Sequence, residues 1–175
     1  MKTALSLAAA MLLLAQPVQA QSRCLTAPEA EAVTLVALPT ILEQTGVVCA
    51  TRLPTSSLLR QSDGPFLARY KDAAERAWPN ARAAIVKLSD PLIDGLLQSD
   101  YARPLLTAAL APLLVGRINP ADCGTIDRLV TQLSPLPPQN AAGVIVTTLG
   151  YLKAEKAKGK DSAVPDLLLC AGSAR

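Results

Sequence analysis

Carboxylates are the side chains here that could carry proton-transfer chemistry, because the chain contains no histidine. Without histidine there is no histidine-based triad, no histidine-ligated metal and no use of the commonest general base. Asp90 and Asp94 are four residues apart and would share a face if one helix held both, while Glu43 and Glu75 stand alone. Paired acid and base catalysis needs two carboxyls in one cleft with separated pKa values. Helix capping and solvent exposure explain these acids more simply, so we expect no catalytic residue.

Sequence motifs for other kinds of chemistry do not occur. The chain has no Gly-x-Ser-x-Gly elbow, no Ser-x-x-Lys pair, no phosphate-binding glycine loop and no EF-hand pattern. The cysteines lack zinc-finger spacing and form no Cys-x-x-Cys, so neither a metal site nor a redox or haem motif is indicated. We therefore predict that the protein is not an enzyme and holds no metal and no cofactor.

The cysteines are typical of structural disulfides. Cys24, Cys49, Cys123 and Cys170 are an even number in a chain that begins with an export signal, which predicts two disulfide bonds. Three pairings are open, and we favour Cys24 with Cys49 and Cys123 with Cys170 because these close the shorter loops. Since bonded cysteines need Cα atoms within about 7 Å, the helix expected between Cys24 and Cys49 must bend at Pro39 or fold back at its ends.

The first twenty residues read as a secretory signal peptide. Lys2 is followed by an apolar core at 4–15, by Pro17, and by small residues before a cleavage site after Ala20. The core is too short for a bilayer span, which needs about 20 residues. We expect a periplasmic or secreted protein that does not span a membrane after cleavage, with one helical domain at 21–175.

Charge and composition also exclude some classes of partner. Without Lys2 the chain has 16 basic and 14 acidic residues, and the sequence contains no long block of like charge. A nucleic-acid binder would normally show a concentrated basic face, so we expect no nucleic-acid partner.

The positions of the prolines indicate where helices begin. Thirteen of the fourteen lie after the leader, and several follow a capping residue at an apparent helix start, where the missing N–H costs nothing. No stretch shows sustained alternation of period two, which argues against strands. The pattern predicts an all-α, single-domain bundle of about six to eight short, proline-started helices with two disulfides. The main helices are expected at 27–45, 65–77, 80–88, 90–98, 100–116, 120–133 and 141–157.

The run Pro104–Gly116 is the longest uncharged apolar stretch after the leader. At thirteen residues it is too short to span a bilayer, and a helix that is apolar on most faces belongs inside a soluble domain. We expect it to form the central helix. We also expect the helix at 141–157 to pack directly on it, with Gly143 and Gly150 allowing a close approach.

Three aromatic residues lie within thirteen positions, at Phe66, Tyr70 and Trp78. Such a cluster either fills a core or anchors an interface, where tryptophan and tyrosine often carry binding energy. Two functions remain open. The first is a rigid protein-interaction module that binds another protein of the cell envelope, as an inhibitor, an immunity-type protein or an accessory factor would. The second is a carrier of an apolar small molecule or lipid in a cavity between helices.

Overall fold

The fold is all-α, as the sequence predicts. The structure is a computed structural model that describes residues 23–90, 94–160 and 168–170, so the leader at 1–20 lies outside it. The α-helices are α1 (Ala27–Val48), α2 (Pro65–Leu88), α3 (Asp94–Leu97), α4 (Ala102–Val115), α5 (Cys123–Leu133) and α6 (Pro138–Ala157), with 3₁₀ turns η1 (Leu58–Arg60) and η3 (Pro120–Asp122). The described residues form no strand beyond one isolated parallel bridge, between Leu25 and Leu169.

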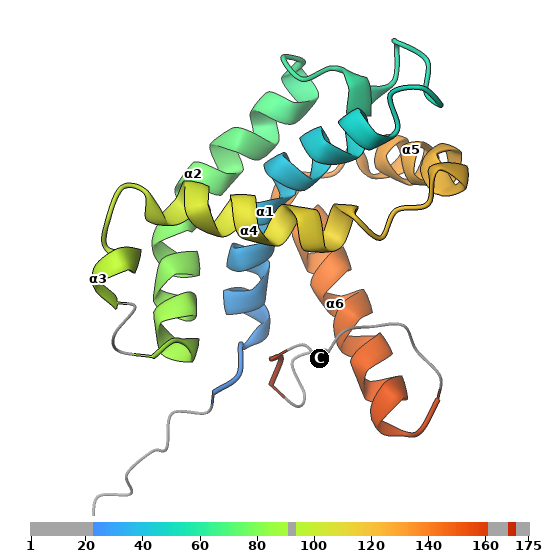
Figure 1. Ribbon diagram of the computed structural model, residues 1–175. Helices are drawn as coiled ribbons and strands as arrows, with labels where there is room; N and C mark the ends of the chain where they lie inside the picture. Colours follow the sequence, from blue (N-terminus) through green and yellow to red (C-terminus); the bar gives the residue numbers. More distant parts are fainter. Residues whose placement is uncertain (1–22, 91–93, 161–167, 171–175) are drawn as a thin grey trace, which may run out of the picture.

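Prolines both start helices and lie inside them. Pro28, Pro65 and Pro138 stand in the first turn of α1, α2 and α6, where a backbone N–H would have no partner within the helix. Helices α1, α2 and α4 each hold one internal proline as well, and α2 continues through Pro79 instead of ending there. Both α1 and α2 change direction along their length, as a helix does at an internal proline (Figure 1).

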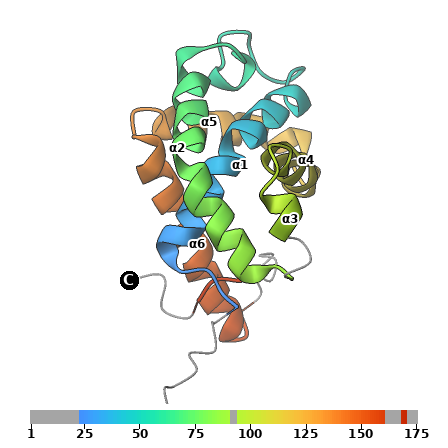
Figure 2. The ribbon, with the colours of Figure 1, turned by 90° about the vertical axis from the view of Figure 1, so that its left-hand side faces the viewer.

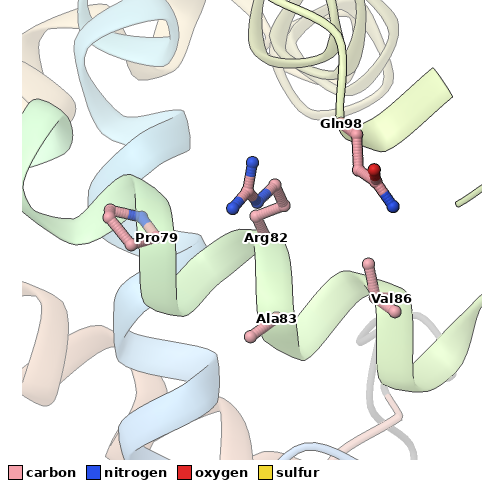
Figure 3. A pocket seen from close by; sticks show the side chains of 5 residues that line it. All are labelled: Pro79, Arg82, Ala83, Val86 and Gln98. Atoms are coloured by element: carbon pink, nitrogen blue, oxygen red, sulfur yellow. The ribbon is translucent and has the colours of Figure 1, made fainter. Parts of the chain in front are cut away.

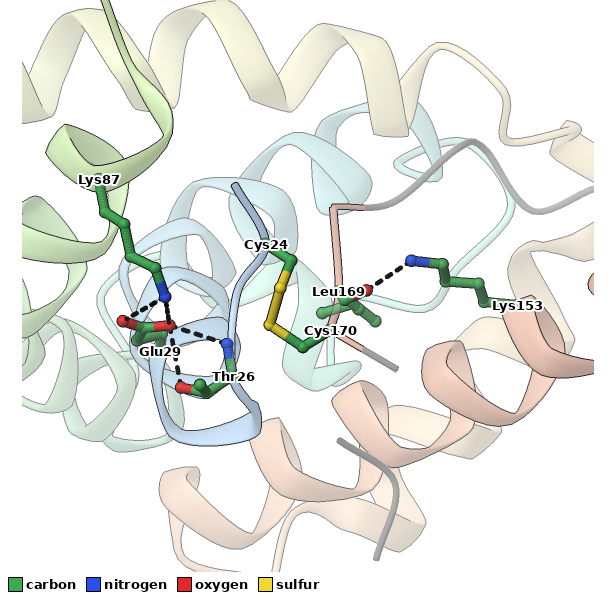
Figure 4. Close-up of a disulfide and its surroundings, with 7 residues drawn as sticks. All are labelled: Cys24, Thr26, Glu29, Lys87, Lys153, Leu169 and Cys170. Atoms are coloured by element: carbon green, nitrogen blue, oxygen red, sulfur yellow. Dashed lines mark hydrogen bonds and ion pairs between the residues drawn. A yellow bond between two sulfur atoms is a disulfide. The ribbon is translucent and has the colours of Figure 1, made fainter. Parts of the chain in front are cut away.

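The start of α1 carries the capping box that the sequence predicts. The carboxylate of Glu29 accepts hydrogen bonds from the backbone N–H of Thr26 at 2.8 Å and from its hydroxyl at 2.9 Å. It also accepts one from the ammonium of Lys87, near the end of α2, at 2.9 Å (Figure 4). These donors, with the backbone N–H of Thr26 first among them, hold the pKa of Glu29 below its ordinary value of 4.5.

We expect Glu29→Gln to destabilise the protein most at neutral pH. Because the folded-state pKa is lowered, the ionised carboxylate adds stability above its ordinary pKa, and this contribution disappears as the pH falls through the folded pKa. The difference in melting temperature between wild type and variant, followed by circular dichroism, should shrink between about pH 7 and about pH 3. A difference that stays constant or grows toward acid pH would contradict this role.

The central helix is α1, not the helix of the Pro104–Gly116 run. It packs against α2, α4 and α6, and its buried residues lie on several faces, as at Ala32, Leu35 and Leu38. Helices α4 and α6 lie on opposite sides of α1 (Figures 1 and 2). The expected packing of 141–157 directly on Pro104–Gly116 is therefore wrong, and Gly143 faces Glu31 of α1 instead.

The disulfide pairing that we favoured from loop length is also wrong. Cys24 is bonded to Cys170 with Cα atoms 4.9 Å apart, and Cys49 is bonded to Cys123 with Cα atoms 5.6 Å apart. The reason lies in α1, whose 22 residues separate Cys24 from Cys49 by about 33 Å of helix. Pro39 does not fold this helix back on itself. Each bond instead joins an end of α1 to a segment far along the chain.

The two disulfides differ in their exposure. Cys49 and Cys123 are both 0% exposed and lie in a cluster with Leu53 and Leu59. The bond between Cys24 and Cys170 is half-buried and lies beside the Leu25–Leu169 bridge (Figure 4).

We expect a mild reductant to open the Cys24–Cys170 bond first, because thiol–disulfide exchange requires access to a sulfur atom. Brief treatment of the folded protein with a phosphine reductant, followed by alkylation and peptide mass spectrometry, should label Cys24 and Cys170 well before Cys49 and Cys123. Labelling of all four cysteines at one rate would show that the buried bond is not protected by the fold.

Candidate interaction surface

The three aromatic residues singled out in the sequence do not share an exposed surface. Phe66 is 7% exposed and Tyr70 is 4% exposed, and their rings meet edge to face with centroids 5.1 Å apart. Trp78 is half-buried and packs against the same core cluster, which is built from α1, α2 and the start of α6. Burial also raises the pKa of the Tyr70 hydroxyl.

An exposed apolar stripe runs along the outer side of α4. Its members are spaced at i, i+3, i+4, i+7 and i+11, and all are exposed: Tyr101, Pro104, Leu105, Ala108 and Pro112. Tyr101 is 74% exposed and Leu105 is 53% exposed. We call these five residues the α4 face. The chain carries no charge between Pro104 and Gly116, so the stripe is bounded only at its ends, by Asp100 and Arg117.

Contacts near the two ends of α4 hold the helix against the rest of the protein. Ala102 at its first residue is 1% exposed and Val115 at its last is 5% exposed. Arg103 reaches from α4 to Glu75 of α2, with 2.5 Å between the guanidinium and the carboxylate. Both ends of the helix are therefore anchored, and the α4 face is presented by an element of defined position.

A contiguous exposed apolar surface on a soluble protein is typical of an interaction site. Tyrosine is enriched among the residues that contribute most to protein interfaces. Sequence reasoning missed Tyr101 and Leu105 because the whole apolar run was assigned to the core. The helical period of 3.6 residues could have predicted this exposure. It places apolar residues of the run on two faces of the helix, and a helix that packs on one side can bury only one of these faces.

A second uncharged stripe lies on α6, on the far side of α1 from α4. Val144 is 46% exposed and Tyr151 is 60% exposed, with exposed Thr147 and Thr148 between them. The hydroxyl of Thr148 donates a hydrogen bond to the backbone carbonyl of Val144 at 2.8 Å. This stripe is more polar than the α4 face, and its position makes it a useful comparison surface.

Two hollows between the described residues bear on the carrier hypothesis, one small and one open. An apolar cavity of about 80 Å³ lies between α1, α2, α5 and α6 and is bordered by Phe66 and Tyr70. A cleft of about 540 Å³ lies beside α2, with Arg82 on one side and Gln98 on the other (Figure 3). Ligand pockets usually measure about 300–1,000 Å³ and enclose most of their ligand. The apolar cavity is well below that range, and the cleft has only one cation and one amide.

The four candidate carboxylates lie on different segments of the fold. Asp90 lies outside any helix and α3 begins at Asp94, so the two do not share a helix face. Glu43 is paired with Lys71 at 2.8 Å, and Glu75 with Arg103. In the part of the chain that the structure describes, no three cysteine, aspartate or glutamate side chains gather as metal ligands would.

One helix of the described chain, α1, is long and apolar enough to cross a membrane. Of its most apolar stretch, 44% is buried inside the fold, and the core helix of a soluble protein meets the same criteria of length and composition. The central position of α1 accounts for its apolar character.

Comparison with known proteins gives no match, whether to a protein-family model, to a curated protein or to a solved structure. The α4 face and the fold that presents it are therefore the basis for any functional statement.

Proposed function

We propose that the mature chain is an exported, disulfide-stapled interaction module that binds another protein of the cell envelope through the α4 face. The observation that carries the proposal is the exposed, uncharged stripe centred on Leu105. A partner suited to it presents an apolar, uncharged surface of its own, with polar groups that meet Asp100 and Arg117 at the ends.

The compartment supports this proposal. Two disulfides suggest an oxidising, extracytoplasmic location. Together with the leader at 1–20, this points to a periplasmic or secreted protein. A rigid body is also suited to binding, because a preorganised surface loses little conformational entropy when a partner docks.

The carrier hypothesis has less support. The apolar cavity of about 80 Å³ is too small for a lipid, and Phe66 and Tyr70 already fill the space around it.

Capture of envelope proteins by the immobilised mature protein tests the proposal. Wild type and Val144→Asp, whose change lies on α6, should retain the same partner, while Leu105→Asp should lose it. Sedimentation of the purified protein is the second measurement and should give a monomer. A dimer that Leu105→Asp dissociates would mean that a second copy covers the α4 face. Either that result, or capture that is unaffected by Leu105→Asp, would overturn the proposal.

A further inference from the structure

A groove of about 250 Å³ lies where α1, α2 and the start of α6 meet, away from the α4 face. Its floor is apolar and made of buried side chains: Ala32 and Leu35 from α1, and Ala73 and Ala77 from α2. Three of these four residues are alanines, whose short side chains leave the space between the two helices open. A groove of about 250 Å³ with such a floor accommodates small aliphatic groups, and its volume limits the size of the ligand.

The rim of the groove carries one acid, one base and two carboxamides. Glu31 stands on α1, Arg76 and Asn80 stand one turn apart on α2, and Gln139 stands in the first turn of α6. The partly positive start of α6 therefore borders the groove as well. This set of groups offers a cation, an anion and neutral hydrogen-bonding groups within one small volume.

Glu31 differs from the other glutamates of the chain, and it shares the groove with Arg76, an exposed arginine. The chain has five glutamates, and the other four form ion pairs: Glu29 with Lys87, Glu43 with Lys71, Glu75 with Arg103, and Glu155 with Lys158 and Lys160. Neither Glu31 nor Arg76 has a side-chain hydrogen bond or ion pair to any residue of the described ranges. Two opposite charges thus border one groove with their bonding capacity unused.

We propose that this groove binds a short peptide of small residues with both ends free, a site that is separate from the proposed protein interface. The guanidinium of Arg76 would bind the terminal carboxylate through two parallel hydrogen bonds, a geometry that arginine favours. The carboxylate of Glu31 would bind the terminal ammonium. The carboxamides of Asn80 and Gln139 can both donate to a peptide carbonyl and accept from a peptide N–H. The alanine floor would contact the small side chains.

Trialanine and its two blocked forms, N-acetyl-trialanine and trialanine amide, are the probes that test this assignment. Titrations of the mature, oxidised protein followed by NMR should show saturable shifts for trialanine at the side-chain amides of Asn80 and Gln139. Blocking either end should weaken binding about tenfold, because each block removes one charged hydrogen-bond partner.

Variants then assign each end of the peptide to its residue. Arg76→Gln should bind trialanine and trialanine amide equally, and Glu31→Gln should bind trialanine and its acetylated form equally. Arg82→Gln is the matched control, because Arg82 lies on the same helix but lines the cleft of Figure 3 instead of the groove, and it should leave all affinities unchanged.

Three results would overturn the assignment. The first is the absence of saturable shifts with trialanine, and the second is a loss of affinity in Arg82→Gln as large as that in Arg76→Gln. The third is equal wild-type affinity for trialanine and its acetylated form, which would indicate the carboxyl terminus of a protein as the ligand. None of these results bears on the α4 face, so a failure here is distinguishable from a failure of the proposed function.

Discussion

Gly46→Ala should lower the free energy of unfolding by about 3 kcal/mol, because the added methyl group clashes sterically with a backbone atom. A Cβ at Gly46 would lie 1.9 Å from the carbonyl oxygen of Leu59, and no side-chain rotation can relieve such a contact. Either α1 or η1 must move. Leu59 of η1 belongs to the buried cluster around the Cys49–Cys123 bond and Leu42 of α1 packs against it, so movement of either element disturbs that cluster.

The matched control is Gly124→Ala, where a Cβ would meet no atom within 4 Å. Gly124 is the second residue of α5, and replacing glycine with alanine stabilises a helix by up to about 0.5–1 kcal/mol, the value for its middle, where nothing clashes. Thermal unfolding should show Gly46→Ala melting about 10 °C below wild type and Gly124→Ala at or slightly above it. A Gly46→Ala protein as stable as wild type would show that η1 does not lie against α1 as described.

Leu105→Asp should weaken binding of the captured partner at least about 100-fold, which corresponds to nearly 3 kcal/mol. Leu105 lies in the middle of an uncharged stripe, and an aspartate there would have to lose its water inside the interface without a cation to meet it. The same substitution should leave the melting temperature close to that of wild type, because the side chain is already 53% exposed in the free protein.

Val144→Asp tests whether the loss of binding is specific to the α4 face. Val144 is 46% exposed on α6, so its substitution adds the same charge to another apolar helix surface. Titration calorimetry with the purified partner should give an unchanged dissociation constant for Val144→Asp. Equal weakening by both variants would indicate a general effect of negative charge and would remove the α4 face as the site.

Much of the secondary structure could be predicted from the sequence because its signals are local. The proline-led starts at Pro28 and Pro65 and the capping pair of Thr26 and Glu29 act within one helical turn, and the structure confirms them. The presence of two disulfides followed from an even number of cysteines in an apparently exported chain. The pairing could not be predicted, because loop length favours neighbours whereas the 22-residue helix α1, which bends without folding back, separates Cys24 from Cys49.

The prediction of which helix is central was wrong because the burial of a helix depends on tertiary structure. The Pro104–Gly116 run and α1 are both rich in apolar residues, but α1 packs closely against three other helices, whereas among the long helices α4 packs closely only on α1 and reaches α2 through the Arg103–Glu75 ion pair. Which apolar helix is surrounded depends on the path of the whole chain, and composition does not encode it. The aromatic cluster shows the same limit, since Phe66 and Tyr70 are buried while Tyr101 is the most exposed large apolar side chain described.

Site-specific photo-crosslinking in intact cells tests the central claim, that the α4 face is where the partner docks. A benzophenone amino acid would replace Leu105 in one strain, Val144 in a second and the exposed Gln132 of α5 in a third. The account predicts one discrete adduct with a single envelope protein from position 105, and no such adduct from positions 144 and 132. An adduct from either control position without one from position 105, or no adduct at any position, would contradict it.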